Sequence, residues 1–415
     1  MPHEAPAGVA STELPTPPPL PDEPPVEVPP ATSDPPPAPA AREAVISTAD
    51  EWAAGLARTV PAVQFDETPW VEAISLLAAL GSVPVTIDAD VLAPLEVDLH
   101  EPVSLRLESP TLLEALDRVA DQAKLRAKLV EGQVLVTAPD GFRGELQRAR
   151  YSVADLAADS AAMAELALMI ERLVAPERWR KAGGEGSITA ADGALEIVQT
   201  PDVQYEVLVF CEKLRLARGR PLRSRLDPAR FALETRGSRF AAALDRPMTA
   251  NFQSGAPLAE VLGYLAGAAE VDILVDRLGL SAAGVTDGKV VVLSVDQEPL
   301  RGALEKLLAP LGLAHRAVDG DVLQVTSRAR VEARLELEFH PIGPRPPGEL
   351  APETLIEQLK SRLPAARWAE GDAPGGRVVF DAPSRCLLVL QSQPVQAAIE
   401  RILSQSAQRA SPEAP

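Results

Sequence analysis

The stretch that decides the fold reads Val63-Gln-Phe65, Pro69-Trp-Val-Glu-Ala-Ile-Ser-Leu-Leu77 and Val85-Thr-Ile-Asp88. It recurs as Ala250-Asn-Phe252, Pro257-Leu-Ala-Glu-Val-Leu262 and Ile273-Leu-Val-Asp276. Further along, Thr111-Leu-Leu-Glu-Ala-Leu116 matches Pro299-Leu-Arg-Gly-Ala-Leu304, and Gly132-Gln-Val-Leu135 matches Gly320-Asp-Val-Leu323. Most of these pairs lie about 188 residues apart, and such a constant offset through separate segments indicates a duplication.

The first half of each copy has readable periodicity. Val63 and Phe65 alternate with polar residues as in a half-buried strand, and the apolar residues that follow take helical spacing. Further strands, a second helix and a closing hairpin complete the order β-α-β-β-α-β-β. The hairpin turns are predicted at Glu131-Gly132 and Asp319-Gly320, because such dipeptides accept positive φ. The helical residues are Val71, Ile74, Leu77 and Leu80, followed by Leu113, Leu116, Val119 and Ala120.

A second kind of module follows each copy. It is predicted to contain a helix, a tryptophan (Trp179 or Trp368), two strands and a last helix. Thr200-Pro201-Asp202 is typical of a helix start, since proline is favoured in the first helical turn. The last helices are expected at 202–217 and from Pro394 onward. The modules are therefore A (60–139), B (148–217), A′ (247–327) and B′ (334–404), an α+β tandem of β-α-β-β-α type.

The A modules resemble the short N-terminal domain shared by outer-membrane secretins and TonB-dependent receptors. The residues that carry this resemblance are Phe65 and Phe252, Pro69 and Pro257, Asp88 and Asp276, and Gly132 and Gly320. The B modules resemble the ring-building modules that follow that domain in secretins, with a Gln-Thr-Pro or Gln-Ser-Gln-Pro entry to the last helix. The resemblance implies a non-enzymatic scaffold that binds protein partners, including secretion or pilus components or other copies of itself, in the bacterial envelope.

The chain departs from secretins after Gln405, where only a short tail to residue 415 follows, predicted to be disordered. We therefore expect a protein that is not itself a pore. At the other end, residues 1–45 hold about fifteen prolines by position 41 and predict an extended, disordered tether. This segment is read as a spacer or as a ligand for a proline-binding partner.

Localisation is not fixed by the sequence. The resemblance implies the periplasm, but Met-Pro-His-Glu-Ala-Pro shows no basic start followed by an apolar stretch. Either the protein is cytoplasmic or an export signal has been removed. No apolar run is long enough to span a membrane.

The net charge of −19 opposes nucleic-acid binding, which relies on lysine and arginine at phosphates. The alternative function is a nucleic-acid-binding protein. The order of helices and strands in the B modules is similar to that of KH modules, which clamp nucleotides with a GXXG loop. Gly183-Gly-Glu-Gly186 fits that loop poorly and is interpreted as an ordinary connection.

No catalytic, metal-binding or cofactor-binding set is predicted. The histidines His3, His100, His315 and His340 lack ligand spacing, and no nucleophile elbow or phosphate loop is present. Asp88 and Asp276 end equivalent strands and are interpreted as turn or cap residues. Trp179 and Trp368 are expected in cores. Cys211 and Cys386 are expected to be buried small hydrophobes, and the sequence leaves open whether they form a disulfide.

One basic segment stands out in this acidic chain, the linker at 218–246 with the end of the preceding helix. Between residues 215 and 239 it carries eight arginines: Arg215, Arg218, Arg220, Arg223, Arg225, Arg230, Arg236 and Arg239. They are interpreted either as a solvated helix end, where cations complement the helix dipole, or as a contact for an acidic partner. The partner-contact residues predicted are Arg215, Arg218, Arg220, Arg223 and Arg225.

Overall fold

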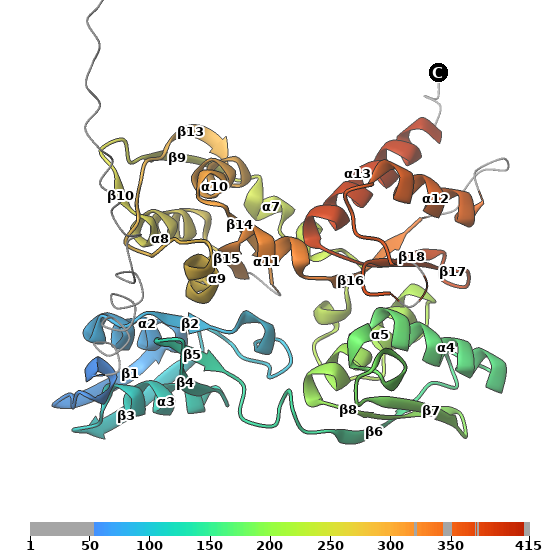
Figure 1. The fold of residues 1–415 in the computed structure, drawn as a ribbon, viewed down its shortest axis with the longest axis horizontal. Helices are drawn as coiled ribbons and strands as arrows, with labels where there is room; N and C mark the ends of the chain where they lie inside the picture. Colours follow the sequence, from blue (N-terminus) through green and yellow to red (C-terminus); the bar gives the residue numbers. More distant parts are fainter. Residues whose placement is uncertain (1–53, 319–321, 343–350, 370, 372, 411–415) are drawn as a thin grey trace, which may run out of the picture. The chain divides into compact units, whose positions relative to one another are not determined.

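A computed structural model describes residues 54–318, 322–342, 351–369, 371 and 373–410, with side chains to 405. The predicted tether at 1–45, His3, the Asp319-Gly320 turn and the end of the C-terminal tail lie outside this range. The α+β class predicted from the sequence is confirmed: small sheets alternate with helices throughout (Figure 1).

Module A contains the predicted order of elements. They are β1 (Ala62–Pro69), α2 (Trp70–Gly81), β2 (Val85–Ile87), β3 (Pro102–Glu108), α3 (Leu112–Gln122), β4 (Arg126–Val130) and β5 (Gln133–Thr137). Strands β1 and β3 form an antiparallel pair, and β2-β5-β4 form a sheet in which β2 is parallel to β5. The predicted turn is confirmed, since Glu131 and Gly132 both take positive φ. Trp70 fixes the core, because its indole donates to the Val119 carbonyl over 2.9 Å.

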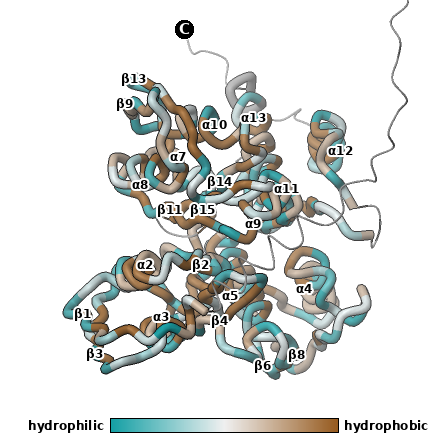
Figure 2. The backbone as a smooth tube through the Cα atoms, turned by 60° about the vertical axis from the view of Figure 1, so that its left-hand side comes forward, coloured by the Kyte–Doolittle hydropathy of each residue, from teal (hydrophilic) through white to brown (hydrophobic). Residues whose placement is uncertain are grey.

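Module A′ repeats this plan with small additions. Its elements are β9 (Pro247–Asn251), β10 (Ala256–Pro257), α8 (Leu258–Ala269), β11 (Asp272–Val275), α9 (Arg277–Ala282), β12 (Val290–Val291), β13 (Ser294–Pro299), α10 (Leu300–Leu308), β14 (Leu313–Ala317) and β15 (Val322–Ser327). The sheets β13-β9 and β11-β15-β14 match those of module A in pairing and direction. Strand β11 is apolar after Asp272, and Figure 2 colours those residues brown.

Asp88 and Asp276 hold the same place in the two copies, as predicted. Asp88 accepts from the Asp90 backbone at the start of a 3₁₀ turn, Ala89–Val91, and Asp276 caps α9. Each carboxylate also accepts a threonine hydroxyl at 2.7 Å and an arginine guanidinium at 2.9 Å. These donors are Thr137 and Arg143 in one copy and Thr326 and Arg330 in the other. The aspartates are therefore structural.

Modules B and B′ share a second plan. Module B has β6 (Gln147–Ser152), α4 (Ser160–Leu173), β7 (Ser187–Ala191), β8 (Ala194–Gln199) and α5 (Pro201–Ala217). Module B′ has β16 (Glu336–Pro341), α12 (Pro352–Arg362), β17 (Arg377–Asp381), β18 (Cys386–Gln391) and α13 (Gln393–Ala410). Both sheets are antiparallel, with β8 or β18 in the centre. Short helices α6 (Arg236–Arg239), α7 (Ala241–Leu244) and α11 (Arg328–Ala333) join the modules.

Helix α13 extends past the boundary expected from the sequence. The sequence predicts a disordered tail from residue 405, but the helix continues to Ala410. No glycine or proline interrupts this stretch before Pro412, so nothing in the local sequence ends the helix earlier. Trp179 is 1% exposed in the core of B, and Trp368 is partly buried against the core of B′, as predicted.

Candidate functional site

The two B modules contact each other through unlike faces. One face of the β16-β18-β17 sheet packs against its own helices, with Leu387 and Val389 in that core. The opposite face, hereafter the outer face, carries Cys386, Leu388 and Leu390, which pack with the helices of module B. Figure 1 shows this sheet between α12 and α13 on one side and α4 and α5 on the other. Strand β18 is therefore buried on both faces, which explains its unbroken apolar sequence.

Aromatic and charged side chains seal the B–B′ contact. The rings of Phe210 (α5) and Phe339 (β16) are 6.0 Å apart and tilted by 53°. The ammonium group of Lys213 lies 6.0 Å from the Phe339 ring centroid and 3.5 Å from the Glu338 carboxylate. At the far end, Arg218 donates two hydrogen bonds to Asp381, at 2.5 and 3.1 Å.

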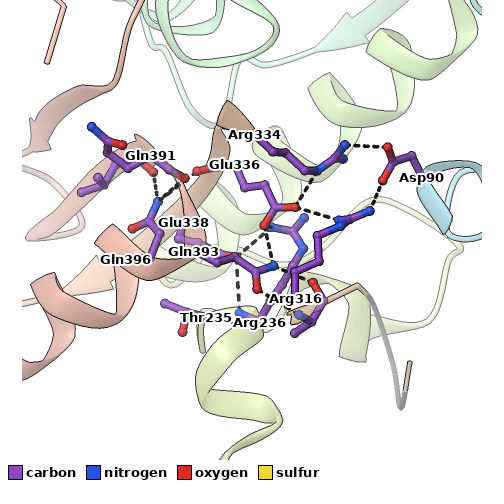
Figure 3. A network of polar contacts seen from close by, with 12 residues as sticks. Asp90, Thr235, Arg236, Arg316, Arg334, Glu336, Glu338, Gln391, Gln393 and Gln396 are labelled. Atoms are coloured by element: carbon purple, nitrogen blue, oxygen red, sulfur yellow. Dashed lines mark hydrogen bonds and ion pairs between the residues drawn. The ribbon is translucent and has the colours of Figure 1, made fainter. Parts of the chain in front are cut away.

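A network of buried charges lies where modules A, A′ and B′ meet (Figure 3). The guanidinium of Arg316 in β14 is 2.6 Å from Asp90 of module A and 3.1 Å from Glu336 of β16. Arg334 spans the same two carboxylates, at 2.5 Å from Asp90 and 2.9 Å from Glu336. The amide of Gln393 donates to Glu336 over 2.7 Å. Three modules are thus joined through one four-charge ring.

The network holds its carboxylates in the charged form. Burial alone would raise the pKa of Glu336, but the charges of Arg236, Arg334 and Arg316 outweigh burial and lower it. The pKa of Asp90 is lowered in the same way. Burial alone would raise it, but the charges of Arg316 and Arg334 outweigh burial. Removing one partner from such a group would leave a buried charge without compensation, which costs far more than a surface pair is worth.

A second group of contacts extends the network into the linker. Arg236 of α6 is 2.7 Å from Glu338, whose side chain is 2% exposed. The hydroxyls of Thr235 and Ser238 donate to Glu400 of α13. The segment predicted as an arginine-rich linker is therefore packed against B′ over these residues.

A cavity of about 450 Å³ adjoins the network, with walls from all four modules. Its lining mixes both charge signs: Lys213, Arg230, Arg316 and Arg334 stand against Asp90 and Glu336. Most of these charges already pair within the chain. The cavity is thus a junction between modules, lined by more basic than acidic side chains.

The arginines predicted to contact a partner divide into two groups. The side chain of Arg215 is 4% exposed and binds Asp155 and Glu212, and that of Arg218 is 14% exposed and binds Asp381. These two charges serve contacts inside the chain, because helix α5 lies between the sheet of its own module and that of B′. Arg220, Arg223 and Arg225 are exposed. For them, contact with a partner stays a prediction.

The remaining candidates for chemistry are placed as structural residues. Cys211 and Cys386 are free, each is 1% exposed, and burial raises the pKa of Cys211 to about 12. Burial lowers the pKa of His315 and of His340, which lie in sheets, while His100 is exposed and 2.9 Å from Asp272. Within the described ranges, no three His, Cys, Asp or Glu side chains are placed to hold a metal ion. In the same part of the chain, no helix combines the length and apolar composition of a membrane span.

The glycine-rich loop after Trp179 has a packing role. A Cβ at Gly186 would lie 2.0 Å from the side-chain amide of Gln199, and a Cβ at Gly376 would lie 2.0 Å from that of Gln391. Gln199 donates to the Arg178 carbonyl and accepts from the Thr200 backbone, so the amide bridges the loop to α5. The loop therefore requires glycine for close approach, and B′ repeats the arrangement.

The charged network was not predicted from the sequence. Glu336 and Glu338 alternate with apolar residues in β16, a pattern that normally indicates a solvent-exposed strand face. Their burial depends on residues far away in the sequence, such as Lys213, which lies 125 positions before Glu338. The one member of this network that the sequence singles out is Arg236, because it belongs to the arginine-rich segment.

No model of a known protein family matches the sequence, and no curated protein matches it. Among solved structures, the crystal structure of the GspC–GspD complex from the type II secretion system of enterotoxigenic Escherichia coli is similar at 15% identity, covering 39% of this chain and 98% of that chain, with a TM-score of 0.15. XcpQN012 is 18% identical over 40% of this chain and 67% of that chain, with a TM-score of 0.16. The 43 kDa tail protein of prophage MuSo2 from Shewanella oneidensis is 16% identical over 23% and 30%, with a TM-score of 0.14. These identities and TM-scores do not assign the chain to a family.

Proposed function

We propose that this chain is a non-enzymatic protein-interaction scaffold of the bacterial cell envelope, built from secretin-type periplasmic modules. The sequence resemblance in Phe65, Asp88 and Gly132 and in their repeats supports the module type and, through it, the periplasm. The protein would act by holding partner proteins, such as other secretion or envelope components.

The observation that carries the proposal is that the B-type module binds protein with its folded faces. The outer face of the B′ sheet takes up two helices of another module through Phe339, Leu388 and Leu390. A sheet face sealed by an aromatic pair and rimmed by ion pairs such as Arg218–Asp381 has the composition of a protein–protein interface. This packing within the chain supports the proposal that such modules recognise folded protein surfaces.

The surface we propose for an external partner is the exposed part of the arginine-rich segment. Arg220, Arg223 and Arg225 are exposed in a chain whose net charge is −19, so they form a local basic surface on an acidic protein. The guanidinium of Arg223 also lies 3.1 Å from Asp155, so only part of its charge faces outward. Such a surface favours a partner with carboxylates at its interface, and it would accelerate their association at low salt.

The test is capture by the immobilised full chain from separate envelope and cytoplasmic extracts. We expect retained proteins from the envelope extract, and reduced retention when Arg220, Arg223 and Arg225 are all changed to glutamate. A matched control changes Arg106, Arg118 and Arg172, on other parts of modules A and B, to glutamate. Equal losses in both variants would refute the surface, and retention from the cytoplasmic extract alone would refute the envelope role.

The nucleic-acid alternative is tested by filter binding of single-stranded RNA and DNA at low salt. We expect no retention, because binding of a polyanion requires several cations to neutralise phosphates. Binding that weakens steeply with salt, and that is lost in the Arg220, Arg223 and Arg225 variant, would favour the alternative over a protein scaffold.

A further inference from the structure

Equivalent positions in modules B and B′ can be assigned from their hydrogen bonds. Gln204 of α5 donates to the carbonyls of Gln147 and Ile197, and Gln396 of α13 donates to those of Glu336 and Val389. Their amide oxygens also have matching partners, the Tyr151 hydroxyl at 2.7 Å and the His340 ring nitrogen at 2.8 Å. Together with the strand registers, these bonds align the two sheets residue by residue.

The alignment shows that the outer faces of the two sheets differ in chemistry. In B′ the outer face presents Leu337, Phe339 and Leu388, and the helices of module B cover it. The same positions in module B are occupied by Arg148, Arg150 and Glu196. The side chains of these three residues are 75%, 53% and 36% exposed.

We propose that the B–B′ contact is one step of a head-to-tail stack of modules, and that Arg148, Arg150 and Glu196 stop the stack at two by excluding a second copy of the chain from the outer face of the B sheet. The contact is heterologous, since helices of one module meet the sheet of the next. A heterologous contact leaves one unused face of each kind and continues into rings or fibres unless something blocks it.

Charge is what blocks the sheet face. A helix pair docked there as α4 and α5 dock on B′ would bury two guanidinium groups at the positions of Leu337 and Phe339. Burying charges without matched partners costs several kcal/mol per ion. Glu196 lies 3.2 Å from Arg150 and 3.9 Å from Arg148, so one carboxylate faces two guanidinium groups. Terminal repeats of stacked proteins carry polar outer faces for the same reason.

On the helix side of B′, the comparison covers two described side chains of α13. Phe210 and Lys213 of α5, which contact B′, correspond to Ile402 and Gln405 of α13. These residues are apolar or uncharged, so α13 could meet a suitable sheet face. Stopping the stack therefore depends on the sheet side of module B.

The test replaces the outer-face side chains of the B sheet with those of B′ in the full chain. The substitutions are Arg148→Leu, Arg150→Phe and Glu196→Leu. Sedimentation velocity over a wide concentration range is expected to show a single monomeric species for the original chain and growing, concentration-dependent species for the triple variant. Adding Ile402→Glu to the triple variant is expected to restore the monomer, because it places a carboxylate on the helix side of the stack. Circular dichroism of each variant, Ile402→Glu alone included, verifies folding.

A matched control places equally apolar residues on another exposed sheet, with Gln64→Phe, Arg106→Leu and Glu108→Leu on the β1-β3 pair. It is expected to stay monomeric. The proposal is overturned if the original chain already assembles and Arg150→Glu disperses it, or if the folded triple variant stays monomeric. It is also overturned if the control associates equally, or if Ile402→Glu leaves the association unchanged, since the contact would then not be head-to-tail.

Discussion

The guanidinium of Arg316 lies 2.6 Å from the carboxylate of Asp90, although 226 residues separate them in the chain. This ion pair joins the two A-type modules, and Glu336 extends it into B′. The side chain of Arg316 is 5% exposed, so its charge is removed from water and depends on these two carboxylates.

The first prediction concerns that arginine. Arg316→Met should lower the free energy of unfolding by about 1.5–3 kcal/mol, because it removes charged hydrogen bonds from Asp90 and Glu336 while Arg334 still pairs with both. Urea denaturation followed by circular dichroism measures the change. Arg148→Met is the control, since its side chain is 75% exposed and its loss should cost less than about 1 kcal/mol. Equal effects would show that the network does not join the modules.

The second prediction concerns acid stability across the B–B′ contact. Burial alone would raise the pKa of Asp381, but hydrogen bonds from Arg218 and Ser384 outweigh it and lower the pKa. A carboxyl whose pKa is lowered by folding contributes stability above its unfolded pKa, about 4, and loses that contribution as the pH falls further.

Asp381→Asn should therefore destabilise the chain at neutral pH and make its stability less dependent on pH below about 4. Free energies of unfolding at several pH values between neutral and acid measure this. Asp66→Asn serves as the control, because that residue is exposed. A variant that keeps the original slope below pH 4 would show that Asp381 contributes no acid dependence.

The third prediction uses the cysteines as reporters. Cys386 lies under module B and Cys211 has a pKa raised by burial to about 12, so neither thiol should react with a thiol reagent in the native protein. Arg218→Ala should accelerate labelling of Cys386 over Cys211, because Arg218 holds Asp381 at the edge of the contact. Mass spectrometry locates the label. Equal acceleration at both cysteines would indicate global unfolding instead.

The fourth prediction concerns the repeated glycine and glutamine pair. Gly186→Ala should destabilise the chain by about 1–3 kcal/mol, since the new Cβ displaces Gln199 and leaves buried backbone groups without hydrogen bonds. Gly376→Ala should act similarly through Gln391. Gly144→Ala is the control, because nothing lies within 4 Å of a Cβ there. Thermal unfolding ranks the three, and a neutral Gly186→Ala would disprove the packing role.

The order of elements within modules was predictable because it depends on local spacing. The Glu131-Gly132 turn and the Asp88 and Asp276 caps follow from neighbours in sequence, and the structure confirms them. Leu80 shows where periodicity fails: steps of three residues from Val71 rotate around α2, so Leu80 lies on the same side as Leu76, and the two are 58% and 51% exposed.

The contacts between modules could not be predicted in this way. Glu338 reads as an exposed strand residue, and only the approach of Lys213 and Arg236 from other parts of the chain makes it a buried one. For Arg215, helical spacing placed the side chain at an exposed helix end, while Asp155 and module packing enclose it. Such burial is set by distant partners, which local patterns do not encode.

The double-sided burial of β18 also bears on how this chain can evolve. A duplicated module is initially redundant, and either copy can be lost without harm to the other. Once Phe339, Leu388 and Leu390 became a binding face, deletion of module B would expose a wide apolar surface on B′, which promotes aggregation. The second B-type module has thereby become dependent on the first, and the duplication can no longer be reversed one module at a time.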